Sequence, residues 1–181
     1  MKYIAVFCSA NDLDQKYTKS AGEVALLMVK NGFNLVWGGT DKGLMKIIAT
    51  GVQKGGGKII GISMEILKDL VRKNADEMII AKNLGEGKAL MLERCDAVLV
   101  LVGGIGTLDE LTEIVELKKH NLHDKPVVVL NTQNFYEGLK IQLKKMKEEG
   151  FINQSLDKLI YFANRPEEAL EFIQVKLANI A

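Results

Sequence analysis

The stretch that decides the fold is Ala97–Thr107, AVLVLVGGIGT. Its first six residues, Ala97–Val102, form a continuous apolar run, which predicts a strand buried on both faces as in a parallel sheet. The turn Gly103-Gly104-Ile105-Gly106-Thr107 follows directly, and a helical pattern covers Gly106–Lys119. A buried strand that passes through a glycine turn into a helix is the repeating unit of α/β proteins.

The same alternation extends outward in both directions. Short apolar runs predict strands at Tyr3–Cys8, Phe33–Trp37, Lys58–Ile62, Glu77–Ala81, Ala97–Val102, Pro126–Leu130 and Lys158–Phe162. Longer segments predict helices at Gln15–Lys30, Leu44–Gln53, Met64–Arg72, Gly87–Arg94, Gly106–Lys119, Phe135–Glu149 and Pro166–Asn179. No linker, repeat or low-complexity tract interrupts the pattern. We therefore expect one α/β domain over residues 1–181, a Rossmann-like, doubly wound and mainly parallel sheet with helices on both faces.

Composition excludes several classes of protein. The 181 residues are 48% hydrophobic and 26% charged, with a net charge of +1, so neither nucleic acid nor an acidic membrane is an expected partner. No apolar stretch approaches the ~20 residues that span a bilayer. The first run, Tyr3–Cys8, is shorter than the ~7–15 residues of a signal-peptide core. We expect a cytoplasmic protein.

Metal and cofactor chemistry is not expected. Cys8 and Cys95 lie in or beside apolar runs without a C-x-x-C pair, so both are interpreted as buried thiols. The acidic residues lack a histidine or cysteine partner, and the sequence indicates no cofactor site. His120 and His123, at a helix end and in the loop after it, are better explained as solvent-facing or capping residues.

The third post-strand turn is the strongest candidate for a phosphate site. Gly103, Gly104 and Gly106 lack a Cβ, so they allow positive φ and a close approach of an anion to the backbone. A helix that begins at about Gly106 presents free N–H groups, and Thr107 adds a hydroxyl donor. The alternative is a tight strand-to-helix connection whose glycines serve packing only.

Two earlier turns reach the same edge of the sheet. Ser9-Ala10-Asn11 follows the first strand, and Gly38–Gly43 follows the second. In the second turn, Gly39 and Thr40 are candidates for phosphate or ribose binding. Asp41 fits a helix cap at least as well as a sugar contact, and Lys42 has the alternative of a solvated surface charge.

Acidic residues follow the third turn. Glu110 and Glu113 share one face of the predicted helix, whereas Asp109 is interpreted as a complement to the helix dipole. A carboxylate held close to a ribose can stabilise positive charge at C1′ or activate a water molecule. Both actions are required to cleave a glycosidic bond.

These residues carry a family resemblance. Val102–Glu110 resembles the P-G-G-x-G-T-x-x-E motif of the Lonely Guy (LOG) family, cytokinin riboside 5′-monophosphate phosphoribohydrolases once labelled lysine decarboxylases. The likeness covers nearly the whole chain. Similar segments are Ala5–Asn11, Gly38–Met45 (the family's G-G-G-x-x-G-L-M), Ile59–Ile62, His120–Pro126 and Glu149–Ile152.

The resemblance implies hydrolysis of an adenine-type nucleoside 5′-monophosphate, either AMP or a cytokinin riboside monophosphate, to the free base and ribose 5-phosphate. It implies that Glu110 is catalytic and that Glu113 neighbours the ribose or the water. It places the 5′-phosphate on Gly103, Gly104, Gly106 and Thr107, with Ser9 and Asn11 facing the same cleft. It also implies a homodimer or higher homo-oligomer in which the partner subunit completes the pocket.

One departure from the family pattern bears on activity. In the family's M-x-x-R-K motif the arginine is catalytic, and the matching stretch here is Leu84-Gly85-Glu86-Gly87-Lys88. Lys88 is kept as a binding candidate, but Gly87 stands at the arginine position, and a backbone does not replace a bidentate guanidinium. Lys88, Lys42 and Arg94 are the cations available to substitute, with Arg94 about two helical turns too far along.

Alternatives from other classes follow from that departure. The chain is either the enzyme or a non-catalytic nucleotide-binding protein on the same scaffold. A carrier of another phosphorylated ligand, such as a molybdenum cofactor, has no local feature in its favour. Lysine decarboxylation is disfavoured because no lysine can be argued as a pyridoxal phosphate site.

Overall fold

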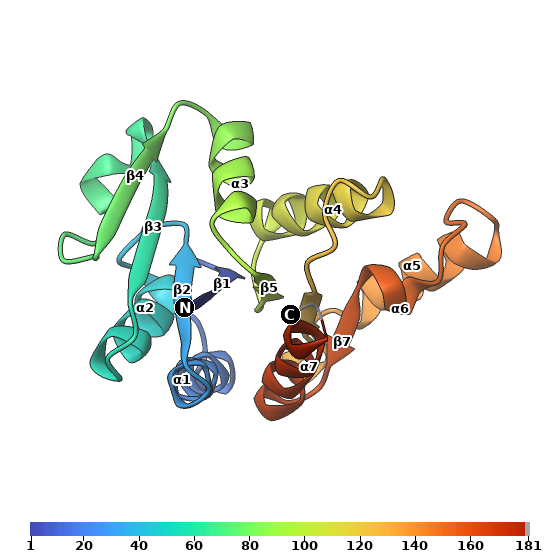
Figure 1. The fold of residues 1–181 in the computed structure, drawn as a ribbon, viewed down its shortest axis with the longest axis horizontal. Helices are drawn as coiled ribbons and strands as arrows, with labels where there is room; N and C mark the ends of the chain where they lie inside the picture. Colours follow the sequence, from blue (N-terminus) through green and yellow to red (C-terminus); the bar gives the residue numbers. More distant parts are fainter. Residues whose placement is uncertain (180–181) are drawn as a thin grey trace.

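The computed structural model describes residues 1–179, and within them seven parallel strands form one sheet in the order β4-β3-β2-β1-β5-β6-β7 (Figure 1). The strands are β1 (Lys2–Phe7), β2 (Phe33–Trp37), β3 (Ile59–Met64), β4 (Glu77–Ala81), β5 (Ala97–Val100), β6 (Val127–Leu130) and β7 (Tyr161–Ala163). The α-helices are α1 (Gln15–Lys30), α2 (Gly43–Lys54), α3 (Leu84–Glu93), α4 (Ile105–Lys119), α5 (Glu137–Glu148), α6 (Leu156–Leu159) and α7 (Pro166–Ala178). Two 3₁₀ helices, η1 (Glu65–Leu70) and η2 (Thr132–Asn134), complete the set.

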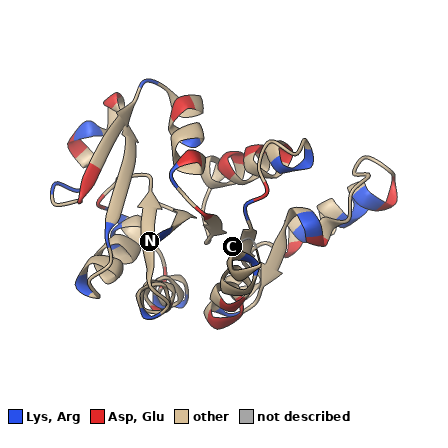
Figure 2. Cartoon of the chain, in the orientation of Figure 1, with Lys and Arg blue, Asp and Glu red and all other residues tan. Residues whose placement is uncertain are grey.

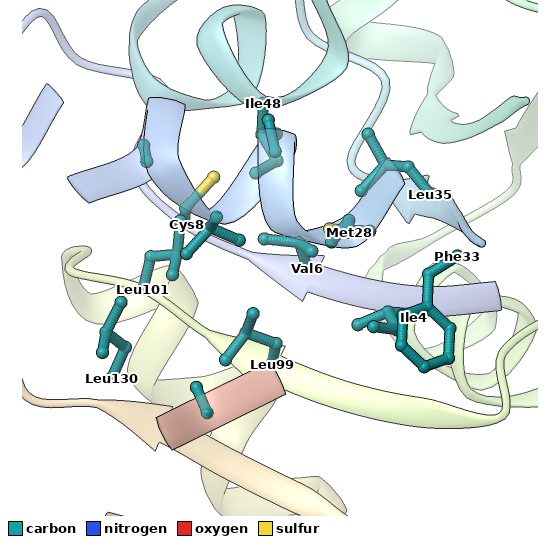
Figure 3. Packing of buried hydrophobic residues seen from close by; sticks show 14 of the residues in the cluster. Ile4, Val6, Cys8, Met28, Phe33, Leu35, Ile48, Leu99, Leu101 and Leu130 are labelled. Carbon is teal, nitrogen blue, oxygen red and sulfur yellow. The ribbon is translucent and has the colours of Figure 1, made fainter. Parts of the chain in front are cut away.

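The sheet is buried on both faces because its central strands have no polar face. Alternate residues of β1 enter different cores: Ile4 and Val6 pack in the core under α1, α2 and α7, and Ala5 and Phe7 pack in the core under α3, α4 and α5. Figure 3 shows Val6 among side chains of α1, α2 and β5. The predicted doubly wound, parallel sheet is confirmed.

The order of the strands reverses beside β1. Val6 pairs with Trp37 of β2 on one side and with Leu99 of β5 on the other. The chain runs outward from β1 to β4, returns to β5, and then runs outward the other way to β7 (Figure 1). Ligands of such sheets bind beyond the carboxyl ends of the strands at this switch point, which here is bounded by Cys8 and Val102.

Two predicted elements differ from the structure. Met64–Arg72 is not an α-helix, because it forms the 3₁₀ helix η1 and then returns so that Val71 pairs antiparallel with Thr40. Lys158–Phe162 is not one strand, because α6 ends at Leu159 before β7 begins at Tyr161. Both segments are short and apolar, where periodicity does not separate helix from strand.

Among residues 1–179, the structure contains no helix that has both the length and the apolar character needed to cross a membrane.

Candidate active site at the strand switch point

A cavity of about 250 Å³ lies at the switch point between β1 and β5. The two strand ends are joined there, because Ser9 N donates to Val102 O at 3.1 Å. The lining residues are Cys8, Ser9, Ala10, Asn11, Met45, Gly104, Gly106, Thr107 and Glu110. Three elements thus supply the walls: the turn after β1, the first turn of α2, and the start of α4.

The wall after β1 is a tight polar turn. Asn11 N donates to Ser9 Oγ at 3.0 Å, and Met45 N of α2 donates to Ser9 O at 3.3 Å. The start of α2 reaches this turn because Gly43 has no side chain: a Cβ there would lie 2.3 Å from Asn11 O. Gly43 also has a φ of +54°, which disfavours any other residue.

The wall formed by α4 has the open N-terminus that anion binding requires. Its N-cap is Gly104, and no side chain caps the helix, so the first backbone N–H groups remain available to a ligand. A Cβ at Gly104 or Gly106 would meet nothing within 4 Å, so both glycines leave room above the backbone. Gly103 differs, because a Cβ there would lie 2.2 Å from Thr107 Oγ1. Gly103 therefore serves the packing of Thr107.

Positive φ is not what this turn uses. Among the described residues, the glycines with positive φ include Gly39 and Gly43 of the second turn but none of Gly103, Gly104 and Gly106. The conformational part of the prediction is therefore wrong for the third turn, whose glycines instead provide space and packing.

Glu110 is the ionisable carboxyl of the cavity. Burial raises the pKa of this carboxyl to about 8, and the negative charge of Asp109 adds to the rise while Lys88 opposes it. The raised pKa favours the protonated carboxyl at neutral pH. A carboxyl in a cleft whose pKa is shifted by burial and by specific charged neighbours is a candidate functional group.

Two buried groups lie in the electrostatic environment of Glu110. Burial raises the pKa of the Cys8 thiol, and Glu110 adds to the rise. The Tyr136 hydroxyl donates to Leu101 O at 2.8 Å, and burial likewise raises its pKa. Tyr136 was not identified from the sequence, although its place after the predicted strand Pro126–Leu130 is a signal of the same kind as the other post-strand turns.

Lys88 lies outside the cavity and neutralises two acids. Its ammonium pairs with Asp109 Oδ2 at 2.8 Å and with a carboxylate oxygen of Glu113, and the hydrogen bond to Asp109 is the main reason that the lysine pKa is raised. The Lys88 side chain is 12% exposed. Lys88 and Glu113 thus cross-link α3 to α4 beside the site, and Asp109 has a specific partner beyond the helix dipole.

The second turn is covered by protein. Arg72 N donates to Gly39 O at 2.9 Å, and the Arg72 guanidinium bonds Asp41 Oδ1 at 2.7 Å. The N-cap of α2 is Lys42, which makes no side-chain capping bond, so the alternative in which Asp41 caps this helix is wrong. Thr40 is buried, and neither it nor Gly39 lines the cavity. Arg72 was not identified from the sequence.

The structure therefore divides the candidate residues into two groups. Those that line the cavity are Ser9, Asn11, Gly104, Gly106, Thr107 and Glu110. Those that lie outside its lining are Gly39, Thr40, Lys88, Gly103 and Glu113.

Other polar features lie away from this edge. His120 bonds Glu116 at 2.9 Å on the surface, and His123 Nε2 lies 2.9 Å from Ile114 O. A larger hollow of about 430 Å³ lies beside Pro126 and Val127, at the amino ends of the strands. Over residues 1–179, no three His, Cys, Asp or Glu side chains gather as metal ligands would.

Comparison with known proteins assigns the family. The family model described as "Possible lysine decarboxylase" matches residues 45–173. A relative from Mycobacterium tuberculosis named cytokinin riboside 5′-monophosphate phosphoribohydrolase is 30% identical over 169 residues, covering 92% of this chain and 90% of the relative. The chain belongs to the LOG family. The resemblance seen in the sequence is thereby confirmed.

Another relative supports this assignment, and two solved structures share the fold. A probable cytokinin riboside 5′-monophosphate phosphoribohydrolase from Oryza sativa subsp. japonica is 33% identical over 174 residues, covering 94% of this chain and 71% of the relative. The molybdenum cofactor binding protein of Rippkaea orientalis superposes with a TM-score of 0.74 at 23% identity over 97% of each chain. The Moco carrier protein of Chlamydomonas reinhardtii gives 0.73 at 22% identity over 98% of each chain. These two likenesses establish the fold.

Gly87, which the sequence resemblance aligns with the motif arginine, lies where the structure leaves room for a side chain. Gly87 lies in the first turn of α3, after the N-cap Asn83, whose side chain accepts from Glu86 N at 2.9 Å. A Cβ at Gly87 would meet only Ala81 Cβ, at an ordinary 3.7 Å. Arg94 does not substitute, because its guanidinium is paired with Glu77.

Proposed function

We propose that this LOG protein is a phosphoribohydrolase that cleaves the N-glycosidic bond of an adenine-type nucleoside 5′-monophosphate, releasing the base and ribose 5-phosphate. One observation carries the proposal: the uncapped start of α4 and the half-buried Glu110 carboxyl line the same cavity. An anion site and a carboxyl on one helix match a ligand with a phosphate at one end and a glycosidic carbon near the other. The names of the relatives support the same reaction.

The cavity residues divide the work. Gly104, Gly106 and Thr107 bind the 5′-phosphate through the free N–H groups of α4 and the threonine hydroxyl. Ser9 and Asn11 face the ribose from the opposite wall. Glu110, ionised, stabilises the positive charge that develops at C1′. Gly103 keeps Thr107 in place, and the Lys88–Glu113 pair holds α3 against α4 beside the site.

The reaction balances without a cofactor. The bond between C1′ and the base nitrogen breaks, and its electron pair stays on the base. A water oxygen forms the new bond to C1′, and the proton that the water releases reaches the base through Glu110. The products are a neutral base and ribose 5-phosphate.

Glu110 sets the pH dependence. Its pKa is raised to about 8, and the working form is the ionised one. Base release therefore rises as pH increases through about 8 and levels off above it.

The test is chromatography of reactions with AMP and with a cytokinin riboside monophosphate from pH 6 to pH 9. We expect free base from the wild type and turnover reduced by about a thousandfold or more in Glu110→Gln, the scale of removing a group that stabilises transition-state charge. Glu171→Gln is the control, because Glu171 is exposed on α7 and lines neither the cavity nor the hollow between α4 and α5. No base release by the wild type anywhere in this range rejects the enzyme.

A non-catalytic nucleotide-binding protein is the second candidate, and Gly87 is the observation that favours it. Without a guanidinium at that position, the same cavity can retain a nucleotide without cleaving it. Binding then raises the melting temperature while all of the ligand is recovered. Thermal shift with AMP, followed by quantification of AMP and adenine, distinguishes the two functions.

We also propose that the protein is a homodimer or higher homo-oligomer. An apolar hollow between α4 and α5 includes Leu111 and Val115, and Phe151 at its rim is 78% exposed. Figure 2 shows acidic residues along α4 and lysines on α5, so two copies related by a two-fold axis bring opposite charges together. Light scattering after size exclusion tests this, with Phe151→Glu expected to give monomers and Phe135→Glu, away from the hollow, as the control.

A further inference from the structure

Tyr136 is a buried tyrosine that the proposed reaction does not use. The residue is 5% exposed, and its hydroxyl donates to Leu101 O at 2.8 Å. Burial raises the pKa of this phenol, and the charges of Cys8 and Glu110, two residues that line the cavity, add to the rise. The hydroxyl therefore keeps its proton and can donate a hydrogen bond throughout the neutral pH range.

The Leu101 carbonyl reaches Tyr136 because the chain leaves the sheet early. Leu101 N donates to Phe7 O at 2.9 Å, and a regular parallel ladder would continue with Ser9 N donating to Leu101 O. Ser9 N donates instead to Val102 O at 3.1 Å. Leu101 is 3% exposed, so its displaced carbonyl needs a partner within the protein, and the Tyr136 hydroxyl is that partner.

The same displacement leads the chain into α4. Gly104 is the N-cap of this helix, and the free N–H groups follow it. At Gly103, the residue before the cap, the backbone acts on the Tyr136 phenol as a hydrogen-bond donor and opposes the rise of its pKa. Thr107 packs on the other side of Gly103, where a Cβ would lie 2.2 Å from Thr107 Oγ1. Tyr136 thus holds the turn at Leu101 and at Gly103.

Tyr136 is itself held in place by the loop between β6 and α5. Tyr136 N donates to Asn131 Oδ1 at 2.7 Å, and Asn131 N donates to Ala163 O of β7 at 2.8 Å. The ring also packs edge to face on Phe135, with the two centroids 5.0 Å apart. A side chain fixed by such contacts can fix the geometry of the group that it bonds.

We infer that Tyr136 is a positioning residue of the phosphate site: its hydroxyl holds the turn from Leu101 to Gly104 in the bent form that directs the free N–H groups of α4 into the cavity. This rests on the proposed function for the location of the phosphate. Without the hydroxyl, Leu101 O is satisfied by the regular bond from Ser9 N, and the turn moves towards the straight ladder. Tyr136 therefore acts through the backbone and contacts no ligand.

Binding to the folded protein tests this inference without requiring turnover. Isothermal titration with ribose 5-phosphate compares the wild type with Tyr136→Phe, which keeps the ring and removes the hydroxyl. We expect the affinity of Tyr136→Phe to be about tenfold lower, the scale of one charge-assisted hydrogen bond to the phosphate. Adenosine, which has no phosphate, is expected to bind the two proteins equally.

Two control variants separate positioning from a general loss of stability. Tyr161→Phe removes the hydroxyl of a tyrosine that does not line the cavity. Ile173→Val removes a methylene from the fully buried core under α7. We expect Ile173→Val and Tyr136→Phe each to lower the melting temperature by about 2 to 5 °C. Both controls are expected to keep the wild-type affinity for ribose 5-phosphate at a temperature where all the variants are folded.

The outcomes distinguish this inference from the proposed function. Equal ribose 5-phosphate affinity in the wild type and Tyr136→Phe overturns the role of Tyr136, even if AMP is cleaved. Equal losses of adenosine and ribose 5-phosphate affinity also overturn it, because the hydroxyl would then maintain the whole cavity. The expected loss of affinity in a protein that releases no base rejects the enzyme and leaves the inference standing. A wild type that does not bind ribose 5-phosphate overturns both.

Discussion

The two glycine turns at the carboxyl edge of the sheet look alike in sequence and do different work. Both follow buried strands and both open helices, at Gly38–Gly43 and at Gly103–Thr107. In the turn Gly38–Gly43, Gly39 and Gly43 have positive φ, and a Cβ on either would meet protein atoms at 3.0 Å or less. In the turn Gly103–Thr107, Gly104 and Gly106 have ordinary φ and open space above them.

Glycine is needed for a different reason in each turn. In the turn Gly38–Gly43, other protein atoms fill the space that a Cβ would take: Asn11 does so at Gly43 and Met78 at Gly39. In the turn Gly103–Thr107 the space at Gly104 and Gly106 belongs to the cavity. Measuring stability and binding on the same variants distinguishes the two cases. Substituting a glycine that the fold needs lowers stability, whereas substituting one that a ligand needs weakens binding.

The largest expected effect is a loss of folding stability caused by substitution in the turn Gly38–Gly43. Gly43→Ala forces a side chain into φ +54° and against Asn11 O, which combines backbone strain with overpacking. We expect the free energy of unfolding to fall by about 3 to 4 kcal/mol. Urea denaturation measures it, with Gly104→Ala expected within about 0.5 kcal/mol of the wild type. Equal losses in the two variants would erase the contrast.

The second effect is the pH dependence of folding stability that comes from Glu110, just after the turn Gly103–Thr107. The folded state holds the Glu110 proton up to a pKa of about 8, whereas the unfolded chain loses it near 4.5. The stabilisation is thus complete below pH 4.5 and is lost as pH rises through 8. Between pH 5 and pH 9 we expect the wild type to lose about 2 to 3 kcal/mol relative to Glu110→Gln, discounted for solvent screening. Parallel curves for the two proteins would contradict the raised pKa.

The smallest effect on stability should come from Gly106, with an opposite effect on binding. Gly106 lies in the first turn of α4 and faces open space, so Gly106→Ala should raise the free energy of unfolding by about 0.5 kcal/mol. The added methyl enters the phosphate cradle, and ribose 5-phosphate should bind severalfold more weakly. Thermal unfolding and titration calorimetry on one sample test both. Tighter binding would show that the space is not used by phosphate.

Much of the fold was predictable because buried parallel strands have a strong sequence signature. The continuous run at Ala97 and the amphipathic period of Gln15–Lys30 reproduce β5 and α1 closely. The failures at Met64–Arg72 and Lys158–Phe162 come from short segments whose form is decided by tertiary contacts. In the first of these, Val71 bridges to Thr40, a residue far earlier in the chain.

The candidate site was predictable only where chemistry follows a strand end. Ser9, Asn11 and Thr107 were found in this way, and all three line the cavity. Arg72 and Tyr136 were not, because their partners Asp41 and Leu101 lie 31 and 35 residues away in sequence. Nothing local in a sequence reports such pairings. Nor does it report that Lys88 is held by two carboxylates outside the cavity.

The open space at Gly87 has a consequence for substitution at this position. An added Cβ meets only ordinary contact with Ala81, and α3 is already fixed by the Asn83 cap and by Lys88. The backbone at Gly87 therefore accepts a side chain without a clash at its first carbon. A longer side chain at position 87 would therefore begin in free space beside Ala81, without asking α3 to move.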